Sequence, residues 1–261
     1  MTQWHMEDVV RSDAQAGTDR WTFLIGGAAA IVGSLLGMVG NLVHPETPIG
    51  DPEGVARAIA TSESWLPIHM AIVVGTILML AGLVALAHAV RGDLAAALAR
   101  FALAPAVAGI TVGLVLVILD GVAARQLAEE WATAAGSERD IMLRVVAANE
   151  TMNFALVSLL NVLLAGVAFI GFGLAVAASE NFPRWLGFLA VLGGIESIAA
   201  GLLQAESGSP LAVTRILTIV GPTVFTLWLL VMGVLLVRES SRVRRVSEEA
   251  RPEAVPARSV A

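Results

Sequence analysis

The sequence predicts an all-α integral membrane protein, a bundle of six transmembrane helices with both termini in the cytoplasm. Three observations support this prediction. Of the 261 residues, 57% are hydrophobic and 15% are charged, which is more apolar than a soluble domain. Six apolar runs reach the length of about 20 residues that spans a bilayer core. The loops between them alternate in charge, as loops on opposite sides of a membrane do.

The six runs set the domain organisation. The first is longer than the apolar segment of a signal peptide and follows a polar stretch, so we expect a retained helix. Residues 1–21 form a polar cytoplasmic tail, residues 22–237 the transmembrane domain, and residues 238–261 an Arg-rich tail expected to be disordered. The predicted helices cover residues 22–43, 66–90, 101–124, 152–177, 185–205 and 214–237.

The charge of the loops predicts the orientation. Segment 91–100 and the tail from residue 238 carry an excess of arginine, whereas segments 44–65 and 126–150 carry an excess of acids. Because cytoplasmic loops are enriched in basic residues, the acidic segments are expected outside the cell. The expected location is the plasma membrane. The C-terminal arginines would attract anionic lipid. A pI of about 5.2 and the absence of a basic, aromatic-rich surface exclude nucleic acid as a partner.

Local signals predict two further features outside the apolar runs. Asp51-Pro52-Glu53 combines an N-cap residue, a proline at the first helical position and an acid in the first turn. A short surface helix should therefore follow, up to about Ser62. Ser137 and Asp140 form a capping-box signature, so the fourth long helix should begin near residue 138.

Small residues form stripes along the first and fifth runs. Spacings of three and four relate Gly26, Ala30, Gly33, Gly37 and Gly40, and a similar stripe starts at Gly187. Helices in lipid approach closely at such residues, so both stripes should be buried against neighbouring helices. The same stripes would permit a homo-oligomer.

Polar and ionisable side chains gather in the predicted outer half of the helices. Ionisable groups are costly in hydrocarbon, so they normally face the bundle interior, pair or serve a function. Glu196 should be protonated or paired with Arg125, His44 or His69. We predict an outward-facing pocket that binds a small ligand or ion and is lined by Asn41, His44, His69, Asp120, Arg125, Glu150, Asn153 and Glu196.

Three interpretations of these residues remain open. They can be interfacial side chains that satisfy helix ends and one another. They can form a metal or haem site of a membrane enzyme, with His44, His69 and Glu150 as the candidate metal ligands. Alternatively, Glu196 and Asp120 can act as titrating carboxylates of a proton-coupled transporter.

Several other chemistries are excluded. The chain has no cysteine, which rules out disulfides and thiolate metal sites. It contains no P-loop, no GxSxG nucleophile motif and no HExxH zinc motif. The sequence therefore does not decide whether the protein is an enzyme.

Overall fold

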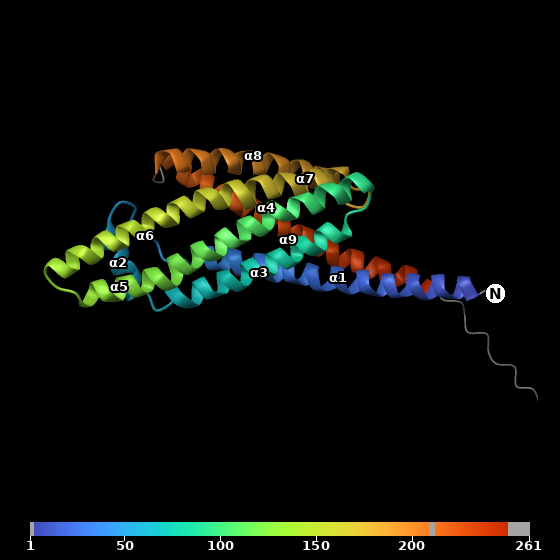
Figure 1. The fold of residues 1–261 in the computed structure, drawn as a ribbon, viewed down its shortest axis with the longest axis horizontal. Helices are drawn as coiled ribbons and strands as arrows, with labels where there is room; N and C mark the ends of the chain where they lie inside the picture. Colours follow the sequence, from blue (N-terminus) through green and yellow to red (C-terminus); the bar gives the residue numbers. More distant parts are fainter. Residues whose placement is uncertain (1–2, 209–211, 250–261) are drawn as a thin grey trace, which may run out of the picture.

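The computed structural model describes residues 3–208 and 212–249, with side chains described for residues 17–208 and 216–246. Within these ranges the chain consists of helices and connecting loops, without a strand (Figure 1). The elements are α1 (Gln3–Leu42), α2 (Pro52–Thr61), α3 (Trp65–Ala89), α4 (Asp93–Ile118), η1 (Leu119–Ala123), α5 (Ala124–Thr133), α6 (Ser137–Val162), η2 (Leu163–Ala168), α7 (Phe169–Ala178), α8 (Arg184–Ser207) and α9 (Ala212–Glu249).

Among the described residues, six helical segments are long and apolar enough to cross a membrane, so the protein is a multi-pass membrane protein. The predicted number of six spans is confirmed. They correspond to Gly17–Leu42, Trp65–Ala89, Asp93–Thr133, Ser137–Ala178, Arg184–Ser207 and Ile216–Val246. Two of these segments are much longer than a bilayer core requires, because η1 and η2 continue α4 into α5 and α6 into α7 without a loop.

Both terminal helices extend beyond the predicted limits. The polar stretch before residue 22 is helical from Gln3. Helix α9 continues to Glu249, so the prediction of a disordered tail is wrong for residues 238–249, and residues 250–261 lie outside the described ranges. Ion pairs of Glu239 with Arg91, at 2.8 Å, and with Arg242 support this extension. The Arg242 pair lies one helical turn away, a spacing that stabilises helices.

The two local helix signals are found where the sequence places them. Asp51 caps α2, and its carboxylate accepts a hydrogen bond from the backbone N–H of Gly54 at 3.0 Å. Helix α6 begins at Ser137, as predicted. Its N-cap is Gly136 with a φ of 60°, however, and no side chain caps the helix. The capping box predicted for Ser137 and Asp140 is therefore not formed.

The stripes of small residues pack within the chain. A Cβ atom on Gly33 of α1 would lie 2.6 Å from the carbonyl oxygen of Gly75 in α3, so the two backbones touch. A Cβ atom on Gly201 of α8 would lie equally close to the carbonyl oxygen of Ser158 in α6. Because both stripes are occupied in this way, a homo-oligomer through them would require these contacts to open.

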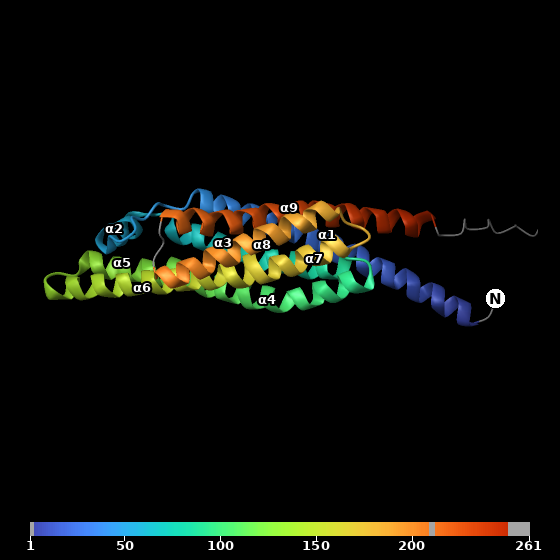
Figure 2. The ribbon, with the colours of Figure 1, turned by 90° about the horizontal axis from the view of Figure 1, so that it is seen from above.

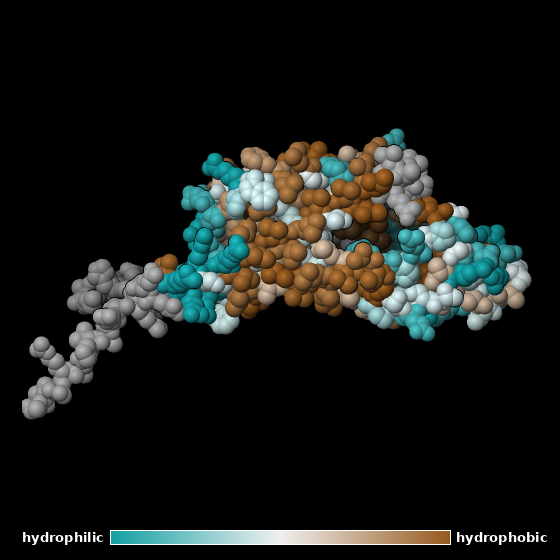
Figure 3. Space-filling view, turned by 180° about the vertical axis from the view of Figure 1, so that it is seen from behind, coloured by the Kyte–Doolittle hydropathy of each residue, from teal (hydrophilic) through white to brown (hydrophobic). Residues whose placement is uncertain are grey.

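The molecule is elongated and has two different ends (Figures 1 and 2). The start of α1 and the end of α9 are both found at one end, where they diverge in Figure 2. At the other end, α2, α5 and the first turns of α6 project as a cap. We call these two ends the tail end and the capped end. An apolar band separates the hydrophilic surfaces of the two ends (Figure 3). The side on which each end lies stays a prediction.

The cap has a small apolar core of its own, formed by Val55, Ala56, Ile59, Trp65, Ala124, Ala128, Trp131 and Val146. Arg125 fastens this cap, because its Nη1 donates to the carbonyl oxygens of Ile59 at 2.8 Å and Ser62 at 2.7 Å. These carbonyls lie at the end of α2, where helical partners are lacking. The side chain of Arg125 thus joins α5 to the end of α2.

Candidate functional site

Two imidazoles and a carboxylate meet where the bundle joins the cap. His44 follows the end of α1, His69 lies in the second turn of α3, and Asp120 lies in η1. The Nε2 atoms of His44 and His69 are 3.3 Å apart. Asp120 Oδ2 is 3.1 Å from His69 Nε2 and 3.7 Å from His44 Nε2. The structure therefore brings together three potential metal ligands from three parts of the chain.

The other ring nitrogen of each histidine faces a backbone carbonyl. His69 Nδ1 is 2.7 Å from the oxygen of Trp65, and His44 Nδ1 is 2.9 Å from the oxygen of Pro45. A carbonyl oxygen only accepts hydrogen bonds, so both contacts place the hydrogen on Nδ1. In neutral imidazoles each Nε2 then carries a lone pair, and both lone pairs face the Asp120 carboxylate. Such a group of electron-pair donors is stabilised by a cation or a shared proton.

Asp120 is held on both sides. Asn153 Nδ2, from α6, donates to Asp120 Oδ1 at 3.2 Å, which leaves Oδ2 for the histidines. The indole N–H of Trp65 donates to the backbone oxygen of Asp120 at 3.0 Å. The π-helical geometry of η1 alters the helical register around Asp120, and single π-helical turns occur frequently at functional sites.

Trp65 also packs against both imidazoles, with ring centroids 4.9 Å from His44 and 4.7 Å from His69. Only 1% of this residue is exposed. The sequence does not reveal this role, because a tryptophan at the start of a membrane span usually anchors at the lipid headgroups. The burial of Trp65 on the histidines instead restricts both rings.

The cluster is open on one side. His69 is almost completely buried, with 2% of its side chain exposed, whereas His44 and Asp120 retain 26% and 32%. Gly121 lies under His69, and a Cβ atom at this position would be 2.6 Å from the Cβ atom of His69. The small size of Gly121 thus allows η1 to approach α3. The exposed parts of the cluster are therefore the side chains of His44 and Asp120.

The eight residues predicted to line one pocket occupy different places. His44, His69, Asp120 and Asn153 form the cluster. Glu150 lies close enough to Asp120 for their charges to interact, and it stands one turn before Asn153 on α6. No hydrogen bond or ion pair joins Glu150 to either histidine in the described residues. The carboxylate that lies beside the two histidines is therefore that of Asp120 and not that of Glu150.

The other three residues lie outside the cluster. Asn41 is exposed and donates back to the carbonyl oxygen of Gly37. Arg125 holds the cap. Glu196 pairs with none of its three predicted partners in the described residues, and its Oε2 accepts a hydrogen bond from the Ser197 hydroxyl at 3.4 Å.

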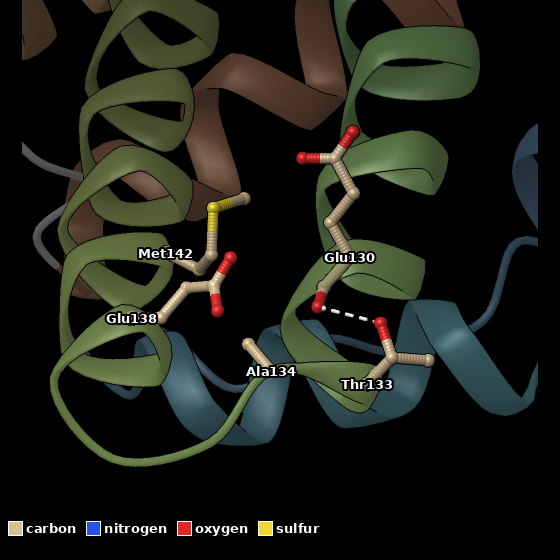
Figure 4. Close-up of a pocket in the computed structure, with 5 residues that line it drawn as sticks. All are labelled: Glu130, Thr133, Ala134, Glu138 and Met142. Atoms are coloured by element: carbon tan, nitrogen blue, oxygen red, sulfur yellow. Dashed lines mark hydrogen bonds between the residues drawn. The ribbon is translucent and has the colours of Figure 1, made fainter.

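A separate pocket of about 230 Å³ lies between α5 and α6, at the far end of α5 from Asp120 (Figure 4). It is lined by Glu130, Thr133, Ala134, Glu138 and Met142. The Thr133 hydroxyl donates to the backbone oxygen of Glu130 at 3.1 Å. The pocket contains two carboxylates but no imidazole, so it offers fewer transition-metal ligands than the cluster.

Comparisons with known proteins place the chain in a family. No curated protein and no solved structure matches it. The model of one protein family, described as "Domain of unknown function (DUF4386)", matches residues 25–233. This match includes the cluster and most of the transmembrane bundle. The chain therefore belongs to the DUF4386 family.

Proposed function

We propose that this protein binds a divalent transition-metal ion, best matched by zinc, through His44, His69 and Asp120. The observation that carries the proposal is the meeting of two imidazole Nε2 atoms, 3.3 Å apart, with a carboxylate oxygen. Both rings donate from Nδ1 to backbone carbonyls. Metal-binding histidines commonly donate their second ring nitrogen in this way, which holds the other nitrogen ready for the metal.

The distances fit tetrahedral coordination. Zinc bonds to imidazole nitrogen and carboxylate oxygen at about 2.0–2.2 Å, so adjacent ligand atoms in a tetrahedral site lie about 3.3–3.5 Å apart. The three distances in the cluster are 3.1, 3.3 and 3.7 Å. Small shifts of the more exposed His44 and Asp120 side chains would complete the geometry. Asn153 would orient the second oxygen of Asp120, as residues around zinc sites do.

The same arrangement argues against haem. Two histidines that bind one haem iron lie on opposite faces of the porphyrin. In the cluster the two Nε2 atoms face each other at 3.3 Å, and Asp120 is adjacent to both. No porphyrin plane fits between them. The histidines would instead occupy neighbouring positions around a single ion.

Three protein ligands leave one tetrahedral position for water or a small ligand, which is typical of catalytic zinc sites. Glu150 favours a catalytic use as a second candidate function, because this carboxylate lies near Asp120 and has no hydrogen-bond partner described. A bound metal would supply an acidified water, and Glu150, whose charge interacts with that of Asp120, would be the candidate general base. The protein would then be a metal-dependent membrane enzyme that acts at the capped end.

The proposal includes a location and an orientation. The excess of acids in the loops of the capped end supports a position outside the plasma membrane, and the excess of arginine at the tail end supports a position in the cytoplasm. Arg238, Arg242, Arg244 and Arg245 lie on α9 at the tail end, where anionic lipid would be attracted to them. The metal would therefore be taken from the outside.

The test is metal content. Protein purified in mild detergent and equilibrated with zinc should hold one equivalent after desalting. The His69→Ala variant should lose the metal. His88→Ala is the matched control, because His88 pairs with Asp19 at the tail end, and it should keep the metal. A wild-type protein that retains no zinc, copper, iron, cobalt or manganese would overturn the proposal and favour a proton shared by the cluster.

Two carboxylate variants test the ligand set. Asp120→Asn should lose most of its zinc, because an amide is a poor substitute for a carboxylate ligand. Glu150→Gln should keep one equivalent, since Glu150 is placed beside the ligands and not among them. The reverse pattern would support the set predicted from the sequence, His44, His69 and Glu150, against the set that the structure favours.

A further inference from the structure

Buried polar side chains continue from the cluster into the membrane along the contact of α6 with α8. Asn153 binds Asp120, and Gln204 of α8 donates from Nε2 to the backbone oxygen of the adjacent Phe154 at 2.9 Å. Two turns deeper on α6, Asn161 is completely buried. It lies beside Gly201 of α8, where a Cβ atom would be 3.2 Å from the Cβ atom of Asn161. The contact is therefore polar over several turns.

The line ends at Glu196. Ser197, one turn from Gly201, is completely buried and donates to Glu196. Gly221 of α9 packs against both side chains, because a Cβ atom there would lie 2.7 Å from Glu196 Oε2. The π-helical segment η2 faces this part of α8, with Gly166 against Ile198. A second π-helical segment thus lies near a second intramembrane carboxyl group.

Three oxygen atoms on this line lack hydrogen-bond partners in the described residues. They are Asn153 Oδ1, Asn161 Oδ1 and Glu196 Oε1, and all three atoms are buried. Buried polar atoms are nearly always satisfied by protein or by ordered water. Oxygen atoms without a partner can accept hydrogen bonds from water or hydronium, or they can bind a small cation.

Aromatic side chains close the line on the tail side of Glu196. Phe169 packs on Phe225 and Trp228 with ring centroids 5.3 and 5.2 Å apart. These rings are fully buried, and a Cβ atom on Gly193, one turn before Glu196, would touch Phe169 at 2.9 Å. The core beyond them is apolar and includes Leu229 and Met232.

We infer that a hydrated cavity between α6, α8 and α9 gives water and small cations access to Glu196 from the capped end only. This inference goes beyond the metal site and does not depend on it. Each of the three buried oxygen atoms without a hydrogen-bond partner would bind water or a cation in this cavity. The aromatic cluster of Phe169, Phe225 and Trp228 would be the closed end.

Cysteine accessibility tests the inference, because the chain has no native cysteine. Single variants Ser197→Cys and Asn161→Cys would be treated with 2-aminoethyl methanethiosulfonate, a small cationic reagent, in lipid nanodiscs. Ile110→Cys is the matched control. Ile110 is also buried and lies at a similar depth, because the glycines on either side of it, Gly109 and Gly113, contact Leu164 and Leu160.

Ser197→Cys should react at least about tenfold faster than Ile110→Cys, because the reagent attacks thiolate, which forms in water and not in an apolar core. The Ser197 exchange replaces a single atom, so the test stands even if Asn161→Cys fails to fold. Equal, slow reaction at 197 and 110 would overturn the hydrated cavity. Met232→Cys should stay unreactive, and fast reaction there would overturn the closed end. Repeating the experiment with His69→Ala keeps the result separate from metal binding.

Discussion

His44 and His69 place their Nε2 atoms 3.3 Å apart although they are 25 positions apart in the sequence, His44 in the loop after α1 and His69 in α3. The rings meet at an interplanar angle of 68° and share Trp65 as a neighbour. Contacts to backbone carbonyls orient both rings. The pair is thus built by the fold and not by a local motif, and this arrangement leads to specific expectations for its supporting residues.

Asn153→Leu should weaken zinc binding by about 10- to 100-fold, because the residues that orient metal ligands have effects of this size. The substitution removes the hydrogen bond to Asp120 Oδ1 and frees the carboxylate to rotate. Competition with a coloured chelator measures the affinity. Asn149→Leu is the control, a buried asparagine one turn away on the same helix. Equal affinities of all three proteins would show that Asn153 has no orienting role.

Gly121→Ala should disturb the cluster directly. The added Cβ atom would lie 2.6 Å from His69 Cβ and 2.7 Å from its Cγ, so His69 or η1 must shift. Overpacking of this kind destabilises a protein by about 1–3 kcal/mol. Denaturation in mixed micelles and zinc content should both report the loss. Gly17→Ala meets no atom within 4 Å and should be neutral or slightly stabilising. A fully stable, zinc-loaded Gly121→Ala protein would contradict the contact.

Arg125→Ala should loosen the cap and leave the transmembrane bundle intact. Two carbonyl groups at the end of α2 lose a charged donor, and each such hydrogen bond contributes about 1.5–3 kcal/mol. Hydrogen exchange should become faster in α2 and stay unchanged in α3. Arg57→Ala removes an exposed ion pair with Glu53 and should change exchange little. Unaltered protection of α2 in Arg125→Ala would show that the apolar contacts of the cap suffice.

The orientation can be determined with single cysteines at exposed positions near the two ends of the molecule. Ile49→Cys lies in the loop between α1 and α2 at the capped end, and Leu94→Cys lies at the start of α4 at the tail end. In intact cells an impermeant thiol reagent should label position 49 and not position 94, because the basic loops are predicted inside. The opposite labelling would place the His44 and His69 cluster in the cytoplasm.

The class of the fold and much of its local structure follow from patterns among neighbouring residues. Apolar length predicts six spans because every backbone polar group in lipid must be satisfied within a helix. Asp51-Pro52-Glu53 predicts α2 because an N-cap and a first-turn proline depend only on neighbouring residues. The small-residue stripes indicate which faces touch, since close backbone approach needs no side chain. His44, His69, Asp120 and Asn153 are recognisable as polar groups near one end of their helices.

Which polar groups meet depends on how the helices pack and cannot be predicted from these patterns. Asp120 and Glu150 are equivalent by sequence, yet the π-helical turn of η1 and the packing of α3 on Gly121 bring Asp120 to the histidines. Arg125 and Glu196 were predicted for the same pocket, but one fastens the cap and the other lies deeper between α8 and α9. The depth of a residue in the membrane follows from counting residues along its helix. The direction of its side chain around the helix depends instead on local winding and on neighbours distant in the sequence.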